Sequence, residues 1–145
     1  MIAIASDHGG LELKTAIVEL LQQRNMAYVD HGTHGQDSVD YPDYAALVAK
    51  AVTSGTAEAG ILICGTGIGM SIAANKFPGI RAALVHDEFT AQMAHEHNNA
   101  NILVLGGRLL SPEQGRKLVE VWLDADYEGG RHQNRLDKIA ALEQP

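Results

Sequence analysis

An expected strand, a glycine-rich turn and an expected helix follow one another in residues 60–76, and no other run constrains the fold as strongly. Residues 61–63 are apolar and predict a buried strand that ends at Cys64, the only cysteine of the chain. Glycines stand at positions 65, 67 and 69, and the largely apolar residues 70–76 predict a helix. Such a turn directs several backbone N–H groups into one small space at the positive end of a helix. It is therefore suited to hold an anion, either bound or developing during a reaction.

Segments that predict strands alternate with segments that predict helices along the whole chain. The apolar segments typical of strands are residues 2–6, 27–30, 60–63, 81–85 and 101–105. Helical periodicity and helix-start residues mark residues 11–24, 40–54, 70–76, 86–96, 111–122 and 131–142. This alternation predicts an α/β fold of the three-layer, doubly wound, Rossmann-like class, with a five-stranded parallel sheet and a C-terminal helix. The length of 145 residues predicts one domain over residues 1–145.

Charge and composition limit the partners that this chain can have. The net charge of −7 argues against nucleic acid and anionic membrane as partners, because both require a basic face. No apolar run approaches the roughly 18 residues of a membrane span, and the N-terminus lacks the basic region of a signal peptide. A single cysteine excludes an internal disulfide and is typical of a reducing cytoplasm, where we expect this protein. An anionic metabolite would need positive charge concentrated at its site.

Polar residues at the carboxyl ends of the expected strands are the first candidates for a site. In doubly wound sheets, ligands bind beyond these ends, at the topological switch point. The candidates are Asp7 and His8, residues 64–69, His86 and Asp87, and Arg108. If Asp7 and Cys64 serve one site, the first and third strands must be neighbours. This favours a strand order that starts 2-1-3 over the 3-2-1 order of dinucleotide-binding folds.

Cys64 has two interpretations of similar weight when its position alone is considered. It is a base or nucleophile, or it is a small buried side chain that closes a strand. The glycine turn favours the first, because a helix N-terminus stabilises a thiolate. Thr66 could relay a proton or only close the turn, and the pattern favours the structural role. A dinucleotide site fits poorly, because Met70 stands where the fingerprint needs a small residue.

Arg131 and Arg135 lie one helical turn apart, with His132 beside them and Lys138 following, and form the densest positive cluster of this acidic chain. A solvated basic face is the commoner meaning of such a pair. Arginine forks nevertheless suit phosphate oxygens well, and a C-terminal helix can serve a neighbouring subunit. We find no convincing zinc spacing among the histidines. His97 precedes the last strand, so the pattern places it opposite the expected site and predicts a structural role.

Several short motifs occur together and in order over nearly the whole length. They are Asp7-His8-Gly9, Asp40-Tyr41-Pro42, Ile63-Cys64-Gly-Thr-Gly-Ile-Gly, Ala73-Ala-Asn-Lys76, His97-Asn98-Asn99, Gly106-Gly-Arg108 and Gly130-Arg-His-Gln. With these motifs the chain resembles the ribose-5-phosphate isomerase B family, which is related to galactose-6-phosphate isomerases. The resemblance implies an aldose–ketose isomerase of sugar phosphates that needs no cofactor or metal. It also implies a homodimer or homotetramer whose sites are shared between subunits.

The resemblance also implies a role for each matching residue. Cys64 is expected to move the proton between C2 and C1, because this chain has no acid at residues 68–71 to replace it. The expected catalytic residues are Cys64, Thr66, His97 and Asp7, with His97 and Asn98 opening the sugar ring. The N–H groups of Gly65, Gly67, Ile68 and Gly69 are expected to hold the enediolate, and Tyr41 to pack against the sugar. The expected phosphate ligands are His8, Arg108, Arg131, His132 and Arg135. The alternatives are a six-carbon substrate (allose or galactose 6-phosphate) and a sugar-phosphate sensor without activity.

Overall fold

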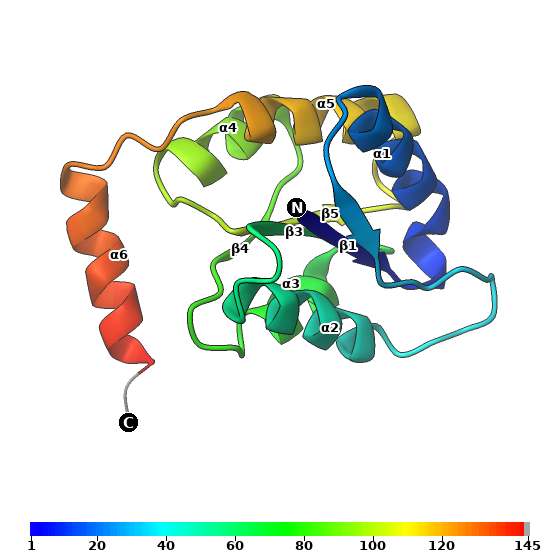
Figure 1. Cartoon of the computed structure of the whole chain (residues 1–145), viewed down its shortest axis with the longest axis horizontal. Helices are drawn as coiled ribbons and strands as arrows, with labels where there is room; N and C mark the ends of the chain where they lie inside the picture. The colour runs from blue at the N-terminus through cyan, green and yellow to red at the C-terminus, as the bar shows by residue number, and fades with distance from the viewer. Residues whose placement is uncertain (144–145) are drawn as a thin grey trace.

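Five parallel strands form the centre of the protein in a computed structural model that describes residues 1–143 (Figure 1). The last two residues of the expected domain lie outside this range. The strand order is β2-β1-β3-β5-β4, which confirms both the predicted class and the 2-1-3 start. The strands are β1 (Ile2–Ser6), β2 (Tyr28–Asp30), β3 (Ala59–Cys64), β4 (Ala82–Leu84) and β5 (Ile102–Gly106).

Helices cover both faces of the sheet, as the alternation predicts. One face packs against α1 (Leu11–Gln23), α4 (Glu88–Glu96) and α5 (Pro112–Asp124). The other face packs against α2 (Tyr41–Thr53) and α3 (Ile68–Ala74). These form the upper and lower helix layers in Figure 1. None of the helices among the described residues is long and apolar enough to cross a membrane.

The three central strands are buried on both faces, and this fixes the direction of each side chain. In β1, Ile2 and Ile4 pack under α1, whereas Ala3 and Ala5 face the α2 layer. The same alternation in β3 turns Ile63 toward α1 and Cys64 toward α2 and α3. Because side chains alternate along a strand, a one-residue slip would exchange these faces. The register therefore determines on which face the thiol of the candidate site lies.

Element boundaries differ from the expectations by one or two residues, and the caps explain two of the differences. Asp87 does not belong to α4: its carboxylate accepts a hydrogen bond from the Thr90 N–H at 2.7 Å and forms a capping box. The hydrogen bonds that the Thr90 N–H and the Thr90 hydroxyl donate to this carboxylate lower the pKa of Asp87. Gly67 adopts a left-handed conformation as the cap of α3, so that helix begins at Ile68 rather than at residue 70.

The C-terminal helix α6 (Arg131–Leu142) stands apart from the two helix layers (Figure 1). Of its residues only His132 and Leu136 are buried. Leu136 and Ile139 line a small cavity together with residues of the β4 edge. The far end of the helix exposes most of Leu142. One chain therefore leaves much of this helix uncovered.

Candidate active site

The turns after β1 and β3 pack against each other at the carboxyl edge of the sheet. Asp7 follows β1, and its buried carboxylate accepts a hydrogen bond from the Gly9 N–H at 2.9 Å. A Cβ built on Gly9 would lie 3.3 Å from both Asp7 Oδ1 and the backbone nitrogen of Gly65. The Gly107 N–H, just beyond β5, donates to the Cys64 carbonyl at 2.7 Å. The ends of three neighbouring strands thus meet at one place, with a carboxylate after β1, the thiol and the glycine loop at the end of β3, and Gly107 after β5.

The Cys64 thiol lies inside the glycine loop and is only 5% exposed. The Gly67 N–H donates to Cys64 Sγ at 3.2 Å, and the Ile68 N–H donates to Thr66 Oγ1 at the same distance. Within residues 1–143, the backbone N–H groups of Gly65, Thr66 and Gly69 donate to no acceptor in the protein. The loop therefore combines a polarised sulfur with unused donors, which can stabilise an anion.

Two larger side chains border the loop. A Cβ on Gly69 would lie 2.4 Å from Tyr41 Cζ, so the tyrosine ring packs directly on this glycine. The Arg108 N–H donates to the Gly65 carbonyl at 2.9 Å, and Arg108 Nη1 lies 3.3 Å from where a Gly65 Cβ would stand. Any side chain at position 69 would displace Tyr41 from this contact. The guanidinium of Arg108 is exposed and available to a ligand.

His8 and Arg108 line an open cavity of about 540 Å³ at this edge. The Val39 N–H donates to His8 Nδ1 at 3.3 Å, which makes Nδ1 the acceptor and assigns the imidazole proton to Nε2. His8 therefore has an N–H donor left for an anion beside the guanidinium of Arg108. A phosphate group suits such a pair of donors.

Lys14 is a supporting residue that the sequence pattern did not reveal. Its ammonium is almost fully buried, donates to Asp30 Oδ1 at 2.8 Å and also bonds the Thr33 carbonyl. These bonds anchor the segment that leads from β2 to Val39, the partner of His8. The sequence feature that could have indicated this role is the position of Lys14 among the inward-facing residues of the amphipathic helix 11–24. A charge that is buried at such a position requires a partner.

The remaining expected site residues lie at the opposite end of the sheet. His97 ends α4, Asn98 follows it, and both precede the amino end of β5, whereas Gly106 at the other end pairs with Cys64. The five residues of β5 rise about 3.3 Å each and separate the ends by roughly 13 Å. The structure thus confirms the position that the sequence predicts for His97. A single chain does not unite it with Cys64.

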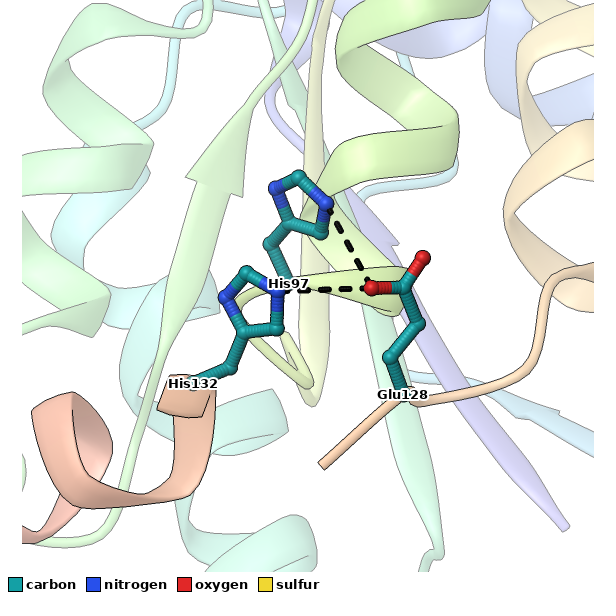
Figure 2. Close-up of side chains that lie close together, drawn as sticks. All are labelled: His97, Glu128 and His132. Carbon is teal, nitrogen blue, oxygen red and sulfur yellow. Dashed lines mark ion pairs between the residues drawn. The ribbon is translucent and has the colours of Figure 1, made fainter. Parts of the chain in front are cut away.

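The residues of α6 join His97 rather than the glycine loop. The imidazole rings of His97 and His132 stack with their centroids 4.1 Å apart, and Glu128 lies beside both (Figure 2). Arg131 and Arg135 belong to the first turns of the same helix and are exposed. Nothing in the spacing of Glu128 links it to His97, so the sequence pattern does not predict its place in this group. The candidate residues therefore form two groups, one at each end of the sheet.

The fold and the carboxyl-edge group together define an α/β protein whose switch point is suited to hold a small anionic ligand beside a thiol. Residues 2–139 match the model of the ribose/galactose isomerase family. The chain belongs to this family, and hence to a family of isomerases.

Two solved structures and one further relative are similar to this chain over nearly its full length. Ribose-5-phosphate isomerase B of Clostridium thermocellum is 51% identical, with a TM-score of 0.97 and 99% and 97% of the two chains covered. The Mycoplasma genitalium ribose-5-phosphate isomerase B with bound ribulose-5-phosphate is 48% identical, with a TM-score of 0.95 and coverage of 99% and 95%. A D-erythrulose-4-phosphate isomerase of Pectobacterium atrosepticum is 42% identical over 98% of this chain and 94% of its own length.

Proposed function

We propose that this protein interconverts D-ribose 5-phosphate and D-ribulose 5-phosphate through an enediolate, with Cys64 as the base. The observation that carries this proposal is the thiol inside the glycine loop, where the Gly67 N–H contacts Sγ at 3.2 Å beside unused N–H donors. The similarity to ribose-5-phosphate isomerases B, one of them with ribulose-5-phosphate bound, supports this substrate.

The reaction needs one proton moved between carbons and one between oxygens. The Cys64 thiolate removes the proton from C2 of the open-chain aldose, and the resulting thiol returns it to C1. The negative charge that develops on O1 is held by the unused N–H groups of the loop, among them those of Gly65 and Gly69. A single donor of this kind contributes roughly 10²–10³ in rate in other enzymes. The hydroxyl of Thr66 and the carboxyl of Asp7 transfer the O2 proton to O1, so no cofactor or metal is required.

The phosphate anchors the substrate and positions C2 at the thiol. His8 and Arg108 contribute an N–H donor and a guanidinium from the cavity beside the loop. Tyr41, packed on Gly69, provides a surface for the sugar. Binding energy from such a remote group can be used to orient the reacting atoms.

Residues at the other end of the sheet complete the site from a second copy of the chain. His97 and Asn98 would open the furanose ring there, and Arg131, His132 and Arg135 would complete the phosphate site. Apolar side chains exposed at or after the carboxyl ends of strands support such a contact: Ile68, Ile72, Phe89 and Leu109 are each more than half exposed. We therefore propose a homodimer, or a homotetramer built from it, in which each chain is one domain.

A catalytic thiol works only while it is reduced, which supports the expectation of a reducing cytoplasmic location.

The test compares the native chain with Cys64→Ala in two measurements, the isomerisation of ribose 5-phosphate and the binding of this sugar phosphate. Cys64→Ser is the conservative control. We expect Cys64→Ala to lose at least roughly 10²-fold in kcat, because the base is absent, while sugar-phosphate binding survives. Native turnover in Cys64→Ala would contradict the role of the thiol. Tight binding by the native chain without turnover of any substrate would indicate a sensor.

The substrate is tested by measuring kcat/KM side by side for ribose 5-phosphate, allose 6-phosphate, galactose 6-phosphate and D-erythrulose 4-phosphate. The four-carbon sugar is included because of the Pectobacterium relative. We expect the highest kcat/KM for ribose 5-phosphate in the presence of a chelator. Preference for a four- or six-carbon sugar would preserve the mechanism and replace the substrate.

A further inference from the structure

Three side chains converge at the amino end of the sheet: His97 from the end of α4, His132 from α6 and Glu128 from the segment between α5 and α6 (Figure 2). The distance from Glu128 Oε2 is 3.8 Å to His97 Nε2 and 3.3 Å to His132 Nε2. One ligand atom of each residue lies within 4.8 Å of the others. Two imidazoles and a carboxylate thus face one small volume.

The side chain of His132 directs an unpaired nitrogen atom at this volume. Its side chain is 9% exposed, and its Nε2 atom is buried without a hydrogen bond among the described residues. The contact with Glu128 does not have hydrogen-bond geometry, and the typical N–H···O distance is shorter, about 2.9 Å. Buried polar atoms are nearly always satisfied, so an unpaired nitrogen directed at a carboxylate indicates a site for a further atom.

The separations fit a metal ion better than direct hydrogen bonds. Zinc binds histidine nitrogen and carboxylate oxygen at about 2.0–2.2 Å. Two ligand atoms of a tetrahedral zinc site therefore lie roughly 3.4 Å from each other. The two distances to Glu128 lie on either side of this value. Two histidines and one glutamate with a fourth position open are a known zinc ligand set. Mg²⁺ and Ca²⁺ prefer oxygen ligands and fit this set poorly.

We propose that His97, Glu128 and His132 bind one divalent transition-metal ion of the zinc type, and that the bound ion inhibits the enzyme. The two rings stack at an angle of 17°, so they must tilt apart before both nitrogens point at one ion. The His97 side chain is 35% exposed and can turn, whereas His132 is held by burial. The bound ion occupies Nε2 of His97 and fixes its ring. The inhibitory half of the proposal rests on the proposed roles of His97 in ring opening and of His132 in phosphate binding, whereas the binding half does not.

Metal binding is measured first, by titrating the full-length protein with Zn²⁺ in a calorimeter and with Co²⁺ in a spectrophotometer. We compare the native chain with Glu128→Gln, which removes the carboxylate but keeps both histidines. Asp126→Asn is the matched control, since it makes the same charge change two residues away at an exposed position.

We expect one ion per native chain and per Asp126→Asn chain, and an affinity lower by on the order of 100-fold in Glu128→Gln, because loss of a ligand should cost at least as much as loss of an outer-shell partner. The Co²⁺ spectrum should lack a thiolate charge-transfer band. Undiminished binding in Glu128→Gln, a thiolate band from Cys64, or no binding would each overturn the site.

Inhibition is then measured as turnover with added Zn²⁺ relative to each variant's own metal-free rate. We expect the native chain and Asp126→Asn to lose activity and to recover it with chelator, and Glu128→Gln to need about 100-fold more metal. An ion that binds through Glu128 and leaves turnover unchanged would overturn the inhibitory half. That result would count against the proposed roles of His97 and His132 in the reaction, and the metal site itself would remain supported.

Discussion

Replacing Gly67 with alanine tests whether the shape of the glycine loop is required for both stability and turnover. Gly67 has a φ of +83°, and an added Cβ would lie 2.5 Å from Leu84 Cδ1 and 3.1 Å from the carbonyl carbon of Leu105. Gly79 has nearly the same φ, +84°, but among the described residues nothing lies within 4 Å of its Cβ position. The two substitutions therefore share the backbone strain and differ in the steric clash.

The strain and the clash have separate magnitudes. A non-glycine residue in the left-handed region costs roughly 1–2 kcal/mol, which both variants incur. Overpacking adds roughly 1–3 kcal/mol at position 67, since the Leu84 side chain can rotate but the Leu105 backbone cannot move easily. We expect Gly67→Ala to lower the free energy of unfolding by about 2–5 kcal/mol and Gly79→Ala by about 1–2 kcal/mol. Urea unfolding of both variants measures the difference.

The clash also moves the loop relative to the thiol. The Gly67 N–H contacts Cys64 Sγ at 3.2 Å, and a displacement of about 1 Å at a reacting group can reduce the rate roughly 10²-fold. We expect a loss of that order in kcat for Gly67→Ala and native kcat for Gly79→Ala. Equal stability losses in the two variants, with native kcat in both, would refute this account of the loop.

Three further substitutions test supporting features. Lys14→Met leaves the Asp30 carboxylate without its buried cation. We therefore expect a loss of roughly 1–3 kcal/mol in the free energy of unfolding and a higher KM for the sugar phosphate. A native KM would show that this pair does not position the phosphate site. Ser111→Ala removes the cap of α5 and should cost about 1 kcal/mol, while an unchanged denaturation midpoint would contradict the capping role. The hydrogen bond from Arg24 lowers the pKa of Asp124, so this pair stabilises the fold above the unfolded carboxyl pKa of about 4 and loses that contribution as the pH falls through the folded value. Asp124→Asn should therefore be less stable than the native chain at neutral pH and approach it in acid, and a gap that persists in acid would count against the ion pair.

The sequence predicts the fold well because its signals are local. Apolar segments, helix caps and glycine turns identify each element, and the alternation of strands and helices leaves few topologies open. The polar residues after the first and third strands even indicate the strand order, because Asp7 and Cys64 can share a site only if these strands are neighbours.

The parts that could not be predicted depend on contacts between distant segments. Glu128 meets His97 only because the segment between α5 and α6 passes the end of α4, where the Glu128 N–H donates to the Glu96 carbonyl at 3.0 Å, and no periodic pattern encodes that path. Lys14 is buried because Asp30 and the Thr33 carbonyl receive its charge, although propensity alone places lysine on a surface. The separation of the site residues into two groups was visible from the position of His97 before the last strand. In the proposed homodimer these groups meet only through contacts between two copies, and no local pattern of the sequence predicts such contacts.

The most direct test of the account is complementation between two inactive variants. Cys64→Ala and the double variant Arg131→Ala/Arg135→Ala are purified separately, mixed, unfolded and refolded together, and assayed for isomerisation of ribose 5-phosphate. If each site takes Cys64 from one chain and the arginines from another, random pairing makes one site in four intact, and about a quarter of native activity returns. If each chain carries its own complete site, every site in the mixture lacks either the base or the arginines. Activity that stays at the level of the separate variants would contradict a site shared between two copies.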